Sequence, residues 1–400
     1  MNGIKIRAVG DICPGDKAIM GLGVLHKSRK FSSQFLFEKI KPYFAASDLV
    51  IGNLEGLLTA SVEQGMWSTK PFCGLPGFAQ ALVDAGFNII NVSNNHVLEY
   101  GPETFKETID YLKKSGIGVC GLRSKERAYY SEPVIIEKKN KVIGVIGYNW
   151  VGVDKFEGAD DLIAQSRDSI VNYGWQRNRT SKEYLSSLVH KRNTNVLSDI
   201  QTLSEKVDLV ILMTHWGYEF VHTPPFGVTL EAKSFIDAGA DCIIGSHPHV
   251  IQGFEFYQNK PIFYSLGNFI FDSRFKKTRY SVILDLIYSD NHLSFNRLIP
   301  VYINSSFQPQ KAEEPSEKKI CSIIEASNRM IQGDNMEEGM DDNLLYEVYE
   351  RQYKRLKINN IMWHFLALKY NPIVIVSIVR KVRNFLSVLQ RRFRGDHIRW

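Results

Sequence analysis

The chain has 400 residues, 44% hydrophobic and 23% charged, which is long enough for a large buried core. Its formal net charge is +6, and residues 371–400 alone carry seven Lys and Arg against one acid, which equals the whole surplus. The remainder is close to neutral, which argues against nucleic-acid binding by the main domain. The five cysteines form no CxxC pair, which argues against a disulfide framework or a structural zinc knuckle and indicates reduced thiols.

The apolar segments indicate a cytoplasmic protein. Residues 1–3 lead directly into a strand-like run at 4–9, which leaves no room for a signal peptide. The longest apolar candidate, 373–379, is interrupted by Ser377 and falls far short of the roughly 18 residues that a membrane-spanning helix needs.

Short apolar runs alternate with amphipathic stretches from residue 4 to about 270, which is typical of a layered α/β protein. We expect strands at 4–10, 48–52, 87–92, 117–120, 134–137, 141–147, 208–213, 241–245 and 261–265. We expect helices at 34–45, 76–85, 102–115, 195–206 and 229–238. Pro102 at the first turn and Gly116 after the last give the third helix well-marked ends.

The chain divides into a main domain, 1–306, and a C-terminal part. Residues 151–194 are a polar, aromatic-bearing insertion that we expect to act as a lid or substrate loop. Residues 281–287 and 293–301 are predicted to close the domain as a hairpin. The polar, acidic stretch 307–341 is the expected linker.

Residues 342–400 are predicted to form a helical, basic, amphipathic C-terminal extension. Such a helix either lies on an anionic membrane surface at the inner face of the cell membrane, or packs on the domain or a protein partner such as a synthase, with 360–400 as the contact. The residues alone favour neither alternative.

Polar side chains follow the predicted strands at five points. Because open α/β sheets bind ligands at the carboxyl ends of their strands, we expect these side chains to converge on one rim. The side chains are Asp11 after the first strand, Asn53 and Glu55 after the second, Asn94, Asn95 and His96 after the third, His215 after 208–213, and His247 and His249 after 241–245.

His247 and His249 alone are weak evidence for a metal site. On an extended backbone, side chains two residues apart point to the same side, and imidazole is a common ligand of transition metals. The other strand ends strengthen the prediction.

The expected rim supplies the ligand types of a dinuclear hydrolase, in which two divalent ions about 3.5 to 4 Å apart acidify a water. Glu55 is placed to bridge the ions, and the mixed nitrogen and oxygen set suits Mn, Fe or Zn. The expected ligands are Asp11, Glu55, Asn95, His215, His247 and His249. His96 is either the catalytic general acid or a residue that caps a turn.

Six motifs carry a family resemblance over most of residues 4–272. They are GDICPGD, GNLEG, SNNHVLEYG, THWGYEF, GSHPHVIQGFE and YSLGNFIFD, in the family's order and approximate spacing. On these the chain resembles the bacterial capsule-synthesis CapA family, the poly-gamma-glutamate branch of the calcineurin-like metallophosphoesterase superfamily. The resemblance implies a four-layered α/β/β/α sandwich, the same six metal ligands, and roles in the pocket for His96 and Glu219.

The chain also departs from the superfamily pattern. Cys13 stands where the superfamily has a histidine ligand, so it is either a thiolate ligand or a small buried residue. Glu55 stands where Asp is usual, and both changes put occupancy by two metals in doubt. Asn53 and Asn94 either orient the ligands or only hold turns. Polymer-synthesis members have an N-terminal membrane anchor, which we do not expect here.

The leading hypothesis is a metal-dependent hydrolase or transferase of capsule, poly-gamma-glutamate or other surface-polymer metabolism. The alternative is a non-catalytic scaffold or accessory subunit of a membrane-associated polymer synthase. Phosphoesters and gamma-glutamyl amides remain alternative substrates, because an acidified water attacks both.

Overall fold

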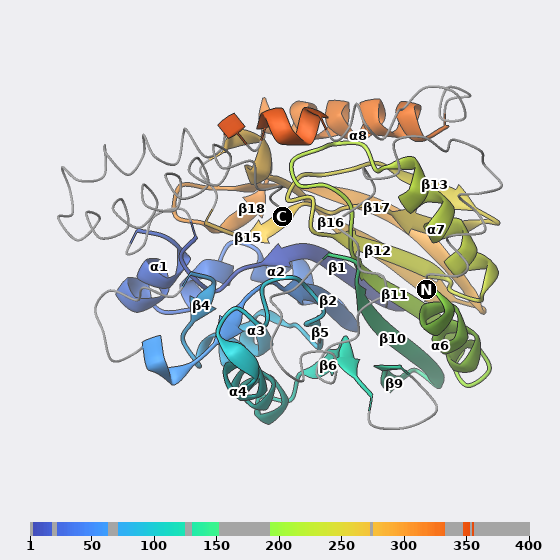
Figure 1. Cartoon of the computed structure of the whole chain (residues 1–400), viewed down its shortest axis with the longest axis horizontal. Coiled ribbons are helices and arrows are strands. Elements are labelled where there is room, and N and C mark those ends of the chain that lie inside the picture. The colour runs from blue at the N-terminus through green and yellow to red at the C-terminus, as the bar shows by residue number, and fades with distance from the viewer. Residues whose placement is uncertain are drawn as a thin grey trace, which may run out of the picture.

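Two large β-sheets packed face to face form the centre of the computed structural model of the chain (Figure 1). The structure describes residues 3–17, 22–62, 71–124, 130–151, 193–272, 275–332, 347–352 and 354–355. No helix within these ranges is long and apolar enough to cross a membrane.

The first sheet has eight strands and a parallel centre. Its order is β18-β17-β16-β1-β2-β5-β6, and β15 pairs with β1 off this path. The strands are β1 (Ile4–Ile12), β2 (Leu49–Leu54), β5 (Ile89–Asn91), β6 (Gly118–Cys120), β15 (Asn268–Ile270), β16 (Tyr280–Ser289), β17 (His292–Ile303) and β18 (Pro309–Lys311). β1, β2, β5 and β6 run parallel, whereas β16 and β17 form the predicted antiparallel hairpin.

The second sheet has six strands in the order β13-β14-β12-β11-β10-β9. They are β9 (Val134–Lys138), β10 (Lys141–Asn149), β11 (Leu209–His215), β12 (Cys242–Ser246), β13 (Phe254–Tyr257) and β14 (Lys260–Phe263). β10, β11, β12 and β14 are parallel, with an antiparallel strand at each edge.

The alternation of side chains along the strands explains the layers. Ile6 and Ala8 of β1 lie in the core between the two sheets, whereas Val9 lies in the core beneath the helices. In the same way, Ile211 of β11 faces the other sheet and Leu212 faces the outer helices. A strand buried on both faces is mostly apolar, as β11 is over Leu209–Met213. The four-layered α/β/β/α prediction is confirmed.

Helices cover the outer faces on opposite sides of the molecule (Figure 1). On the first sheet lie α1 (Val24–Phe31), η1 (Gln34–Phe37), α2 (Lys41–Phe44), α3 (Phe78–Ala85) and α4 (Gly101–Lys114); on the second lie α6 (Thr194–Ser204) and α7 (Phe226–Asp237). Short elements complete the described chain: β3 (Leu57–Leu58), η2 (Ala60–Val62), β4 (Cys73–Gly74), β7 (Leu122–Arg123), β8 (Ser131–Glu132) and η4 (Lys276–Arg279). The helix expected at 34–45 is two short helices, η1 and α2.

The prediction of a linker at 307–341 is wrong for residues 309–332. These residues form β18 and α8 (Ser316–Gln332), which lies along the sheets (Figure 1). The overall composition of the stretch is polar, which is typical of a linker. Ile320, Ile323 and Ile331 nevertheless recur at helical spacing and are buried, which is typical of an amphipathic helix.

Two other predictions fall largely outside the described residues. The insertion at 151–194 is described only at its ends, and the C-terminal extension only at 347–352 and 354–355. The domain boundaries there stay predictions.

Candidate metal centre

The carboxyl ends of strands from both sheets meet at one place, and the predicted residues lie there. Asp11 is the penultimate residue of β1 and pairs in register with Asn53 of β2, and Glu55 directly follows the end of β2. His215 is the last residue of β11 and pairs with Ser246, the last residue of β12. The side chains of two facing sheets therefore share one buried space.

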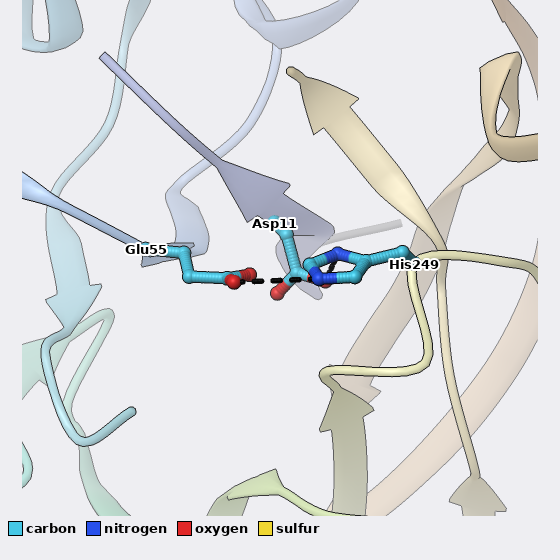
Figure 2. Close-up of side chains that lie close together, drawn as sticks. All are labelled: Asp11, Glu55 and His249. Atoms are coloured by element: carbon cyan, nitrogen blue, oxygen red, sulfur yellow. Dashed lines mark ion pairs between the residues drawn. The ribbon is translucent and has the colours of Figure 1, made fainter. Parts of the chain in front are cut away.

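Asp11, Glu55 and His249 form the centre of this group, and Figure 2 shows their side chains pointing toward one another from three separate segments. His249 Nδ1 lies 3.4 Å from Asp11 Oδ2, and His249 Nε2 lies 3.4 Å from Glu55 Oε1. One ligand atom from each lies within 4.8 Å of the others. All three side chains are buried, so this is the geometry of a metal site rather than of a solvated acidic surface.

Asn95 and His215 lie together beside this group. His215 Nε2 is 2.8 Å from Asn95 Oδ1, and the rings of His215 and His247 have centroids 4.8 Å apart. Two ligands of one ion, each about 2.1 Å from it, lie about 3 Å apart when they are at right angles. The Asn95 and His215 atoms therefore suit a shared ion, and His247 borders both groups.

The residues present fit a metal, because several buried polar atoms have no hydrogen-bond partner within the described part of the chain. They are both carboxylate oxygens of Glu55, Nδ1 of His247 and Nε2 of His249. Buried polar atoms are nearly always paired, and an unpaired one is costly. Carboxylate oxygen and imidazole nitrogen are the ligands of Mn, Fe and Zn. A divalent transition metal would satisfy all four atoms.

Without a metal ion, Glu55 and His249 retain a proton that offsets the negative charge of the buried carboxylates. Burial raises the pKa of Glu55 to about 8. Burial lowers the pKa of His249, but Glu55, Asp11 and Glu219 outweigh it and raise that pKa to about 10. The pair therefore keeps at least one proton at neutral pH, which metal binding would release. Burial also lowers the pKa of His247 to about 3, so its ring is neutral, as a ligand must be.

His96 lies at the edge of the group. Its Nε2 is 3.4 Å from Glu55 Oε1, and its Nδ1 donates to Glu99 Oε1 at 2.5 Å. Its ring stacks on Phe72 with centroids 3.7 Å apart. Burial lowers the pKa of His96, and Glu99 opposes that shift. One ring nitrogen is thus fixed by a carboxylate while the other faces the centre.

Sequence reasoning missed Glu99 and Phe72. Glu99 lies three residues after His96, a spacing that would have placed both on one side of a turn, so a signal for it exists. Phe72 reaches His96 through the fold of a loop and has no local signal. Both restrict the orientation of the imidazole.

Asn53 and Asn94 form hydrogen bonds to the residues and loops of the centre. Asn53 Nδ2 donates to Asp11 Oδ1 at 2.8 Å and lies 3.4 Å from His215 Nδ1. Asn94 donates to the Leu54 carbonyl at 2.8 Å, and its side-chain oxygen accepts from the His96 backbone amide. Both side chains contact the predicted ligands or the loops that carry them.

Glu219 and Cys13 occupy different surroundings. Glu219 Oε1 lies 3.5 Å from His249 Nε2, so it borders the centre. Cys13 is buried with Phe72 and Phe271, and its Sγ lies 3.7 Å from the Gly15 carbonyl. Burial raises the pKa of its thiol well above the ordinary value, which favours the neutral thiol over a thiolate.

His247 and His249 lie on the loop that leaves β12, so the alternation of side chains on an extended backbone does not apply to them. β12 ends at Ser246, and φ is 94° at His247 and 56° at His249. Pro248 between them has a fixed φ, so the chain turns here rather than continuing as a strand. Their side chains meet the centre because the chain turns after β12.

The fold and the site define an α/β/β/α protein with a buried cluster of carboxylates and histidines, suited to a metal ion, at the ends of its parallel strands. The model of a family described as "Bacterial capsule synthesis protein PGA_cap" matches residues 5–273, and the chain belongs to this family.

Curated relatives agree with this assignment. The chain is 28% identical over 333 residues to the capsule biosynthesis protein CapA of Bacillus anthracis, covering 80% of this chain and 71% of the relative. It is 27% identical over 326 residues to the PGA biosynthesis protein CapA of Bacillus subtilis (strain 168), covering 78% and 75%.

Solved structures give weaker likenesses. The calcineurin-like phosphoesterase YfkN from Bacillus subtilis has a TM-score of 0.38 and 14% identity, covering 84% of this chain and 98% of that one. A putative 5'-nucleotidase from Staphylococcus aureus has a TM-score of 0.40 and 15% identity, covering 80% and 58%. At these scores the fold rests on the layers and topology of the chain itself.

Proposed function

We propose that the chain is a metal-dependent hydrolase or transferase that acts on capsule, poly-gamma-glutamate or another surface polymer. The observation that carries the proposal is the set of buried polar atoms on Glu55, His247 and His249 that form no hydrogen bond within the described residues. A fold that needed these residues only for packing would pair or replace such atoms, because each costs free energy. Membership of a capsule-synthesis family supports the substrate class.

The six predicted ligands divide between two groups of donors. Asp11, Glu55 and His249 would hold one divalent ion, and Asn95, His215 and His247 would hold the other. Such ions acidify a water for attack and polarise the bond that is cleaved. Asn53 holds the Asp11 carboxylate in place.

His96 is the proposed general acid. Glu99 accepts the Nδ1 proton, so Nε2 is the nitrogen that faces the centre and exchanges a proton there. Glu99 also stabilises the charged ring, which offsets the effect of burial on its pKa. A proton delivered from Nε2 would neutralise the leaving group.

The first test is the metal content of the purified chain. Asp11→Ala, His247→Ala and His249→Ala should each lose metal in elemental analysis, because each removes a donor from the centre. His292→Ala, which changes an exposed histidine of β17, is the matched control. Wild-type metal content in all three variants would overturn the site.

A metal-supplemented screen of phosphodiesters and gamma-glutamyl amides then identifies the bond. His96→Ala should abolish the activity found while leaving the metal content unchanged. Activity that survives in His96→Ala would remove the general acid from the proposal.

The second candidate is a scaffold of a membrane-associated synthase, favoured by the basic composition of residues 360–400. Upstream of that segment, Tyr349 stacks on Tyr218, the neighbour of Glu219, with ring centroids 5.8 Å apart. Deleting residues 360–400 and measuring binding to phosphatidylglycerol vesicles tests membrane contact at the inner face of the cell membrane. Unchanged vesicle binding, with no loss of a co-purifying synthase, would eliminate this candidate.

A further inference from the structure

Lys17 places a positive charge beside the candidate centre. Its ammonium lies 5.1 Å from the centroid of the Phe72 ring and 4.8 Å from that of the Phe271 ring. Cations bind the faces of aromatic rings at such distances. The backbone amide of Lys17 donates to Asp272 Oδ2 at 2.9 Å, which anchors the residue.

The two rings connect Lys17 to opposite sides of the centre. Phe72 stacks on His96, the proposed general acid, at 3.7 Å between centroids. Phe271 packs against His249, a proposed metal ligand, at 4.7 Å. The ammonium is therefore held by the same rings that fix two site histidines, so it lies at the wall of the site.

No carboxylate within the described ranges contacts the Lys17 ammonium directly. The ammonium forms no ion pair and no hydrogen bond there, although its charge acts on Glu55 and Glu219. Burial raises the pKa of Glu219, but the contact with His249 and the charge of Lys17 outweigh it, so this pKa lies below its ordinary value. Burial lowers the pKa of His96, and the charge of Lys17 adds to that shift. The positive charge of Lys17 therefore acts on the acidic groups of the centre without an ion pair to any of them.

We propose that Lys17 binds an anionic group of the substrate, a carboxylate or phosphate oxygen, next to the bond that is cleaved, and is a specificity-determining residue. This inference rests on the proposed function and narrows its substrate class. An ammonium that forms no ion pair with the described residues, beside the proposed reaction centre, favours a charged ligand, because a neutral sugar unit would supply no ion pair. The expected substrate is an anionic polymer or phosphoester rather than a neutral polysaccharide.

The test measures anion binding separately from turnover. Inorganic phosphate and glutarate are titrated calorimetrically into the Mn-loaded full chain and into Lys17→Met, Lys17→Arg and Lys30→Met. Lys30 is the matched control, because its ammonium also lies over one ring, Phe31, at 5.0 Å, on the outer helix α1. Metal content and thermal melting are measured on the same samples.

We expect Lys17→Met to raise the Kd of at least one anion about tenfold, the loss of one charge-assisted hydrogen bond. Lys17→Arg should retain binding, and Lys30→Met should match the wild type. A loss confined to phosphate indicates a phosphoryl group in the substrate, and a loss confined to glutarate indicates a carboxylate. Lys17→Gln serves as the second neutral variant where Lys17→Met does not fold.

Equal affinities in wild type and Lys17→Met, or a loss that Lys30→Met shares, would overturn the inference. A change in metal content without a change in anion affinity would also overturn it, since Lys17 would then only offset the acidic ligands. If the wild type hydrolyses a substrate and Lys17→Met binds anions unchanged, the proposed function holds and the inference about Lys17 fails. If Lys17→Met loses anion binding but the wild type hydrolyses nothing, the anion site holds and the proposed function fails.

Discussion

At the scale of single residues, the contacts around His96 separate what composition predicts from what only the fold shows. His96 follows Asn95 in a recognisable motif, so its placement at the rim could be predicted. Its orientation depends on Phe72 and Glu99, and on the way that loops after different strands pack. The position of polar residues after predicted strands identifies residues that reach a site. It does not identify the neighbouring side chains that orient them.

Glu99→Gln tests that orientation. An amide in place of the carboxylate loses the charge that stabilises a protonated His96, so we expect kcat to fall on the order of 10-fold to 100-fold. KM and metal content should change little, because Glu99 is not a proposed ligand. Steady-state kinetics on the substrate identified by the screen provide the measurement.

Glu103→Gln is the control, since Glu103 pairs with Lys106 on the exposed face of α4. A rise in KM or a loss of metal in Glu99→Gln, with kcat unchanged, would contradict the role of a positioning residue.

At the scale of elements, prediction succeeded where apolar runs were long. β1, β10 and β11 are strands of seven to nine residues with mainly apolar, buried centres, and α4 has Pro and Gly at its ends. The three-residue strand β15 and helix α8 were missed, because the first is too short for a pattern and the second is amphipathic within a polar stretch.

Ser327 explains how α8 is held. Its hydroxyl accepts a hydrogen bond from the Gly253 amide at 2.7 Å and donates to the His222 carbonyl at 2.6 Å. Ser327→Ala would leave the buried amide unpaired, so we expect a loss of about 1 to 3 kcal/mol in the free energy of unfolding. Urea denaturation provides the measurement.

Ser322→Ala is the matched control, because Ser322 lies on the exposed face of the same helix and bonds only within it. Equal stability of Ser327→Ala and Ser322→Ala would show that α8 is not anchored at this point.

At the scale of the whole molecule, the two sheets bring together residues that are far apart in the sequence. Asp11 and His249 are separated by more than two hundred residues and lie 3.4 Å apart. The strand order that achieves this cannot be deduced from local pattern, although the family motifs imply it. Sequence therefore predicted the layers and which residues meet at the strand ends, while the division into two donor groups and the cation at Lys17 required the structure. The assignment of these residues as metal ligands stays a prediction.

The left-handed backbone at His247 has a consequence for how such a site can be lost. A side chain at φ 94° strains the chain, at a cost of about 1 to 3 kcal/mol, which glycine avoids. His247→Gly and His247→Ala both remove the imidazole, so the difference between them reports the backbone alone. Without metal, we expect the glycine variant to be about 1 kcal/mol more stable in urea, after the greater chain entropy of glycine is subtracted.

Equal stability of the two variants would show that the backbone at His247 is relaxed. If the difference is as expected, a copy of this chain that no longer needs metal would gain stability by exchanging its histidine for glycine. Homologues that retain histidine at this strained position would then be those in which selection still maintains the metal site.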